Sequence, residues 1–196
     1  MTRFLIRRVA ALLILLNGMI SVHAKSPIII MELPEGELAW STERPKKAKM
    51  CVPAAFTDKE GKVEGEYRLH GKIHHPNKRR KVSIGNGTFY IDGKWHTDSG
   101  FQQYALVLNN KARTFDKDRN RKFVRRALCK KGGKTFLVQS RRRMTLNDFA
   151  KECAKVSSDA VYLDMGIYGY GYIGIKDLSL WAYFYRNRQT NWLYIK

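Results

Sequence analysis

Short runs of strand-forming residues joined by two-residue turns recur along this chain, and they limit its possible folds more than any other feature. Asp92-Gly93, Asn109-Asn110 and Gly132-Gly133 are pairs that suit the positive φ angles of tight hairpin turns. Such a turn joins strands that run in opposite directions. The pattern therefore predicts that most of the chain forms antiparallel strands.

Other segments extend this pattern or interrupt it. Residues 32–45 are polar and punctuated by Pro and Gly, so we expect a loop there. Strands are predicted at residues 27–31, 50–52, 66–73, 88–91, 105–108, 111–113, 127–129, 135–138, 160–163, 180–185 and 192–195.

One stretch has helical rather than strand periodicity. The apolar residues of that stretch recur three or four positions apart: Leu146, Phe149, Ala150, Cys153 and Ala154. Thr145 suits the N-cap, Asp148 stands where a capping-box partner would lie, and Ser157-Ser158 ends the pattern. The predicted fold class is therefore α+β, with a large, mainly antiparallel (mixed) β-sheet core and one or more helices packed on it.

The first 24 residues have the pattern of a secretory signal peptide. Three arginines precede the apolar run from Val9 to Leu16, and Ser21–Ala24 offers small residues for cleavage. The run is shorter than the roughly 20 residues of a spanning helix, although an uncleaved anchor remains the alternative. We expect an exported protein, periplasmic or secreted, with residues 25–196 as one domain and no transmembrane anchor after cleavage.

A strong positive charge restricts the partners of the chain. Its 37 Lys and Arg against 17 Asp and Glu give a net charge of +20, in runs such as residues 78–81, 117–126 and 141–143. Export argues against nucleic acid and favours other polyanions, such as phosphorylated glycans, envelope polymers or an anionic envelope surface. The alternative for each run is a solvated surface that keeps the protein soluble.

The three cysteines, Cys51, Cys129 and Cys153, match no zinc-binding spacing. Each has apolar neighbours, so buried thiols are expected, while their pairing cannot be read from the sequence. No metal site is predicted, and no motif identifies a cofactor.

The predicted strand at 160–163 runs into Asp164 and a Gly/Tyr-rich loop that contains Gly166, Tyr168 and Tyr170. A carboxylate there can act as a general acid or base or orient a substrate, and the alternative is an Asp that caps the turn. Gly166 would allow close backbone approach to a ligand, and the alternative is that it only serves the geometry of the turn. The tyrosines could stack on sugar rings or face a core.

Two other positions are candidates from their residue type. His70, beside Gly71, is kept from a cluster with His74 and His75 as a possible base. Arg126 begins a predicted strand, and its guanidinium suits bidentate phosphate binding. The alternative for Arg126 is surface charge, which is the expectation for Arg125.

Four stretches together resemble the phosphodiester glycosidase family, the domain of the enzyme that uncovers mannose 6-phosphate. They span most of residues 50–175: Cys51-Val52-Pro53-Ala54-Ala55-Phe56-Thr57, Asn86-Gly87-Thr88-Phe89-Tyr90-Ile91, Arg125-Arg126-Ala127-Leu128 to Val138, and Thr145-Leu146 through Ala160-Val161-Tyr162-Leu163-Asp164. The chain looks like a divergent bacterial-type secreted member. The resemblance implies a catalytic role for Asp164 and a substrate-binding cleft at the positions of Arg126, Gly166 and Ala55. Together with the candidates from residue type, the predicted catalytic residues are Asp164 and His70, and the predicted substrate-binding residues are Arg126, Gly166, Tyr168, Tyr170 and Ala55.

The sequence departs from the family pattern at positions that line this cleft. The family's Asn and Gly are absent near Ala54-Ala55, and Met165 replaces the Gly after Asp164. Two functions therefore stay open. One is an exported hydrolase that acts on a sugar linked through a phosphodiester in a phosphoglycan or cell-envelope glycan. The other is a catalytically degraded, strongly basic secreted module that binds anionic glycans or envelope polymers.

Overall fold

The computed structural model describes residues 26–75, 82–85, 88–90, 97–115, 121–165, 170–174, 176–178 and 191–196. The predicted leader, the Asp92-Gly93 turn and the predicted strand at 180–185 lie outside the described residues.

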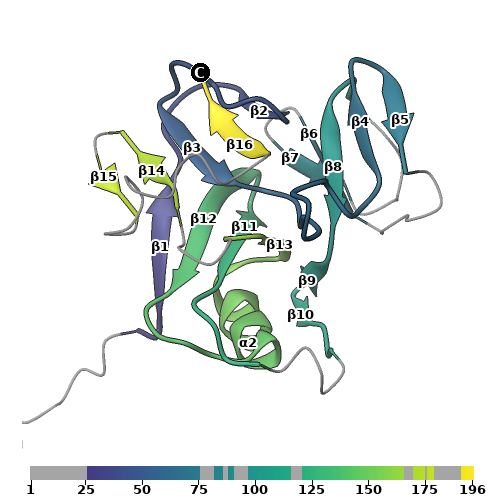
Figure 1. Ribbon diagram of the computed structural model, residues 1–196. Coiled ribbons are helices and arrows are strands. Elements are labelled where there is room, and N and C mark those ends of the chain that lie inside the picture. Colours follow the sequence, from purple (N-terminus) through teal and green to yellow (C-terminus); the bar gives the residue numbers. More distant parts are fainter. Residues whose placement is uncertain are drawn as a thin grey trace, which may run out of the picture.

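The described strands form three sheets in which every pairing is antiparallel (Figure 1). In spatial order, the first sheet comprises β1 (Ile28–Glu32), β12 (Lys134–Ser140), β11 (Arg126–Lys131), β13 (Asp159–Leu163), β9 (Ala105–Leu108) and β10 (Lys111–Ala112). The second comprises β15 (Lys176–Asp177), β14 (Tyr172–Ile173), β3 (Met50–Pro53), β16 (Trp192–Ile195) and β2 (Leu38–Ser41). The third comprises β5 (Lys72–His74), β4 (Tyr67–Leu69), β8 (Gly100–Gln103), β6 (Val82–Gly85) and β7 (Thr88–Tyr90).

The antiparallel character is confirmed, but the prediction of one large sheet is wrong. Tyr104 alone separates β8 of the third sheet from β9 of the first. The chain therefore passes from the third sheet to the first across a single residue.

Two of the predicted hairpin turns are present in the structure. Asn109 and Asn110 have φ angles of 49° and 64°, and Gly132 and Gly133 have φ angles of 55° and 78°. Leu108 pairs with Lys111 in the first hairpin, and Lys131 pairs with Lys134 in the second. Positive φ at both central residues is the geometry that favours Asn and Gly in such turns.

Two local predictions are wrong. The single strand expected over 66–73 is a hairpin, because His70 and Gly71, with φ angles of 49° and 78°, form a turn between β4 and β5. Strand β2 lies inside the loop expected over 32–45. Its buried residues Leu38 and Trp40 pair with β16 near the end of the chain, a long-range contact that overrides the local turn signals.

The predicted helix is α2 (Leu146–Val156), the one α-helix in the described part of the chain. The Thr145 hydroxyl accepts a hydrogen bond from the Asp148 amide at 3.0 Å and donates one to the Asp148 carboxylate at 2.7 Å. Leu146, Phe149, Ala150 and Cys153 form its buried face, and Ser157 is the C-cap. The predicted cap, apolar stripe and end are confirmed.

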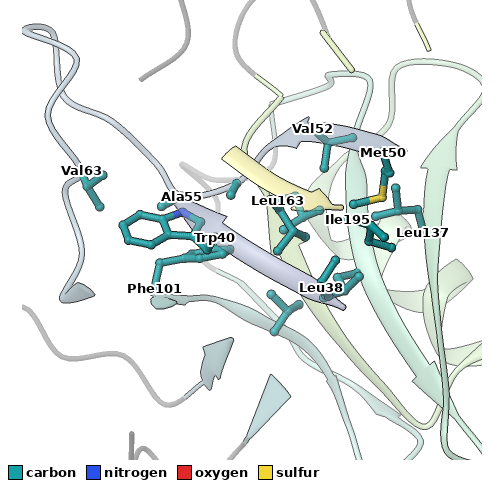
Figure 2. Packing of buried hydrophobic residues seen from close by; sticks show 14 of the residues in the cluster. Leu38, Trp40, Met50, Val52, Ala55, Val63, Phe101, Leu137, Leu163 and Ile195 are labelled. Carbon is teal, nitrogen blue, oxygen red and sulfur yellow. The ribbon is translucent and has the colours of Figure 1, made fainter. Parts of the chain in front are cut away.

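The six-stranded sheet separates two apolar cores. On one face, α2 packs against residues such as Ala127, Val138 and Tyr162. On the other face, Leu128, Leu137 and Leu163 meet side chains of the second and third sheets, including Leu38, Val52 and Phe101 (Figure 2).

The three cysteines are free and buried, as predicted. Among the residues that the structure describes, no helix is long and apolar enough to cross a membrane.

Candidate functional site

Asp164 leaves a strand that is fixed on both sides. Strand β13 pairs with β11 along one edge and with β9 along the other, and Asp164 follows its last residue. The Asp164 amide donates a hydrogen bond of 2.9 Å to the Ala54 carbonyl, just beyond β3. Its side chain is half-buried. The carboxylate therefore stands on a rigid strand end, held against the segment after β3.

Tyr162 and Arg125 lie on the same side of the sheet as α2, close to Asp164. The Arg125 guanidinium donates from Nη1 to the Tyr162 hydroxyl at 3.1 Å and from Nε to the Met144 carbonyl at 2.9 Å, and Nη2 donates to the Arg121 carbonyl. Burial raises the pKa of the Tyr162 phenol, the charge of Arg125 opposes that rise, and the charge of Asp164 adds to it. Asp164 is thus near enough for its charge to act on Tyr162.

Half-buried aromatic rings adjoin this cluster. The Phe56 ring lies 5.3 Å from that of Tyr162 and 5.8 Å from that of Tyr104, and Tyr104 meets Phe115 edge-on at 6.5 Å. Phe56 follows β3 of the second sheet, whereas Tyr104 joins the third sheet to the first. Aromatic faces beside a carboxylate suit the apolar faces of a sugar ring.

Arg126 lies on the opposite face of the same sheet. It pairs with Leu163, and its side chain is fully buried. Its Nε and Nη2 donate to Gln139 Oε1 at 3.1 and 2.8 Å, and Nη1 donates to the Tyr170 carbonyl at 2.7 Å. Burial lowers the pKa of Arg126 to about 9. Arg126 therefore lies on the face of the sheet opposite to Arg125 and Tyr162, and phosphate binding by Arg126 stays a prediction.

Tyr170 packs inside the protein next to Arg126. Its ring is 2% exposed and meets Trp192 edge-on at 5.3 Å, while its hydroxyl accepts a hydrogen bond from Arg44 at 3.0 Å. Burial raises the pKa of Tyr170 to about 12. Gly171, at φ 149°, lies so close to the Arg126 guanidinium that a Cβ at this position would be 2.9 Å from Arg126 Nη1. Arg126 thus positions the backbone of residues 170 and 171, and the Tyr170 ring faces a core.

Ala55 has both backbone polar groups occupied. Its N–H donates to Asn191 Oδ1 at 2.6 Å, and its carbonyl accepts from Asn191 Nδ2 at 3.0 Å. Trp40 Nε1 also donates to Asn191 Oδ1, at 3.3 Å. Ala55 is 2% exposed and belongs to the core. Its contribution to a substrate cleft stays a prediction, because these contacts show how the segment is held and not what it binds.

The remaining predicted residues are placed elsewhere or not described. His70 is exposed in the β4–β5 turn, where its N–H donates to the Ser99 hydroxyl at 3.3 Å. Gly166 and Tyr168 lie outside the described residues. Within the described ranges, no group of three or more His, Cys, Asp and Glu side chains could hold a metal ion.

The sequence reasoning missed several residues around Asp164. Arg125 was predicted to be surface charge, but it is 4% exposed. The sequence predicts only a strand position for Tyr162, and it indicates Phe56 only as part of a segment that resembles the family. The aromatic residues expected to stack on a sugar are instead those of the Tyr-rich loop. The alternation of β13 could have indicated that Tyr162 and Asp164 share a face, since residues two apart in a strand do so.

Comparison with solved structures supports the fold. The structure is similar to the zebrafish N-acetylglucosamine-1-phosphodiester α-N-acetylglucosaminidase catalytic domain auto-inhibited by its pro-peptide, with a TM-score of 0.53 and 14% sequence identity. The match covers 88% of this chain and 85% of that chain. No family model matches the sequence, and no curated protein matches it. At this identity the similarity establishes a shared fold, in agreement with the family resemblance of the sequence.

Proposed function

We propose that this protein is an exported, periplasmic or secreted hydrolase that cleaves a sugar from a phosphodiester, with Asp164 as the catalytic carboxylate. The observation that carries the proposal is the placement of Asp164 at the end of a doubly paired strand, bonded through its backbone to the segment after β3. The shared fold with a phosphodiester glycosidase supports the substrate class.

The chemistry of the substrate explains how a single catalytic carboxylate could be sufficient for hydrolysis. Water adds to the anomeric carbon of the sugar, the bond from that carbon to the phosphate oxygen breaks, and a phosphate monoester leaves with the electron pair. A phosphate oxygen is a weak base, so its departure requires little protonation. Asp164 then has one task, to accept the proton of the attacking water. This differs from most glycosidases, which use an acid and a base together.

The groups around Asp164 have separate roles in the proposal. Phe56 and Tyr104 offer half-buried rings on which a sugar could stack. Tyr162 and Arg125 hold the strand exit in place, because their hydrogen bond links β13 to the segment before β11. Gly166 and Tyr168, which follow Asp164 in sequence, are proposed to complete the sugar pocket.

The proposal is tested by substrate class and by the bond that breaks. The purified protein is incubated in ¹⁸O-labelled water with a sugar-1-phosphodiester, and with the matching phosphomonoester as the control. We expect release of sugar from the diester with the label in the sugar hydroxyl. Label in the phosphate would show phosphorus–oxygen cleavage and overturn the proposed step, and no release from any sugar phosphodiester would overturn the enzyme assignment.

A second function is favoured by the packing of the altered motif positions. Ala54, Ala55 and Met165 are at most 5% exposed, so apolar side chains fill positions that the resemblance assigns to the cleft. This favours a degraded site and a basic module that binds anionic glycans. Such binding should weaken steeply with salt, because it releases counterions. Salt-dependent glycan binding without hydrolysis would support this second function.

A further inference from the structure

Two basic segments lie side by side at one end of the six-stranded sheet. Phe123 and Met144 exchange backbone hydrogen bonds of 3.1 and 2.9 Å, so residues 121–124 run antiparallel to residues 141–144. The second segment joins the end of β12 to α2, close to the start of β1 (Figure 1). We call the exposed residues of the two segments the basic edge: Arg121, Lys122, Phe123, Val124, Arg141, Arg142 and Arg143.

The positive charge of the basic edge is not balanced by acidic residues in the same stretch of the sequence. Residues 121–147 contain ten Lys and Arg and no Asp or Glu. Five of these cations belong to the basic edge, and all five are exposed. A concentration of exposed cations on one edge attracts an extended negative surface more strongly than the same charges spread around the protein.

Apolar side chains are exposed among these cations. Phe123 is 51% exposed and Val124 is 38% exposed. The Arg125 guanidinium lies 5.5 Å from the centre of the Phe123 ring, which fixes the ring at the edge. An exposed aromatic ring within a basic cluster suits the boundary between lipid headgroups and acyl chains.

The N-terminal end of the described chain lies at the same place. The Arg141 amide donates to the Pro27 carbonyl at 2.9 Å, and Arg141 Nε donates to the Ser26 carbonyl at 3.0 Å. The segment that precedes residue 26 is the predicted export signal. The basic edge and the first described residues therefore lie on one side of the protein.

We propose that the basic edge docks the protein on a membrane surface of anionic phospholipids, with Phe123 inserted at the headgroup boundary. The cations provide the long-range attraction, and the ring provides contact that salt does not screen. This docking is independent of the proposed hydrolysis and is measured without any sugar substrate.

The test is co-sedimentation with vesicles of phosphatidylcholine containing phosphatidylglycerol, and with pure phosphatidylcholine vesicles as the control. One variant carries Arg141→Gln, Arg142→Gln and Arg143→Gln. The matched variant carries Lys130→Gln, Lys131→Gln and Lys134→Gln, which remove the same charge from the hairpin at the other end of the same two strands. A third variant, Phe123→Ser, removes the ring, and thermal unfolding verifies that all variants fold.

We expect the Arg triple variant to lose about a hundredfold in affinity for anionic vesicles, since each cation near the surface contributes roughly fivefold. Phe123→Ser should lose about tenfold, and the Lys triple variant should lose much less than the Arg triple variant. Equal losses in the two triple variants would show that diffuse charge suffices, and would overturn the proposal. An unaltered affinity of Phe123→Ser, with equally tight binding to soluble heparin, would identify a polyanion site instead and would also overturn it.

Discussion

Arg125 and Arg126 are neighbours in sequence, yet the structure directs their side chains to opposite faces of one sheet. Arg125 bonds Tyr162 on the helix side, and Arg126 bonds Gln139 and Tyr170 on the other. Strand alternation explains the separation. The sequence alone could not show that both side chains are buried on different faces. Their burial depends on the pairing of β11 with β12 and β13, which are separate segments of the chain.

Arg126 is expected to be a structural residue of the fold. In an Arg126→Met variant, the carbonyl of Tyr170 and the side chain of Gln139 lose their donors inside the protein. The free energy of unfolding should fall by about 3 kcal/mol in urea titrations. Arg113→Met, at an exposed position, is the control and should stay within about 0.5 kcal/mol. A similar small change in both variants would contradict the role of Arg126.

Tyr170 should ionise late. Its pKa is raised from 10.0 to about 12 by burial, partly opposed by Arg44. An absorbance titration of wild type minus Tyr170→Phe should therefore show one phenol that titrates near pH 12. An unfolded phenol ionises from pH 10, so stability from this group is intact below pH 10 and is lost as pH rises towards 12. A difference titration centred at pH 10 would contradict this packing.

At the scale of elements, the sequence predicts correctly those caps and turns whose geometry depends only on adjacent residues. The cap at Thr145 and the Gly132-Gly133 turn need only a few adjacent residues, and both are present. Strand β2 and the His70-Gly71 turn were missed. The first depends on pairing with β16, and the second has His in a place where Asn is the common signal.

The cap of α2 should contribute measurably to stability. Thr145→Ala removes the hydroxyl that accepts the Asp148 N–H and donates to its carboxylate, so unfolding followed by circular dichroism should show a loss of about 1 kcal/mol. Thr145→Ser keeps both hydrogen bonds and should lose little. An equal loss in both variants would mean that the methyl group, and not the cap, matters.

Substitutions in the β4–β5 turn can distinguish a structural role of His70 from a catalytic one. A Cβ added at Gly71 would meet no atom within 4 Å, so Gly71→Ala causes no clash. We nevertheless expect it to destabilise the protein by about 1–2 kcal/mol, because a φ of 78° is unfavourable for a residue with a Cβ. His70→Asn should preserve the turn, because Asn accepts positive φ. A catalytic role for His70 stays a prediction: a loss of hydrolysis by His70→Asn with unchanged unfolding would support it, and hydrolysis at the wild-type rate would contradict it.

At the scale of the whole molecule, the candidate site lies where the three sheets meet. Phe56 follows a strand of the second sheet, Tyr104 joins the third sheet to the first, and Asp164 ends a strand of the first. The sequence indicated the carboxylate, since it follows a buried strand, but it could not show which aromatic residues adjoin it. That information arises only when the sheets pack together.

The measurement that tests the central claim most directly compares hydrolysis of a sugar-1-phosphodiester by wild type, Asp164→Asn and Asp177→Asn. Asp177 is exposed on β15, so its variant controls for the loss of one carboxylate elsewhere. Loss of a catalytic base should lower kcat at least about a hundredfold in Asp164→Asn, with Asp177→Asn at the wild-type rate. Equal rates in Asp164→Asn and wild type would remove Asp164 from the mechanism and contradict the proposed site.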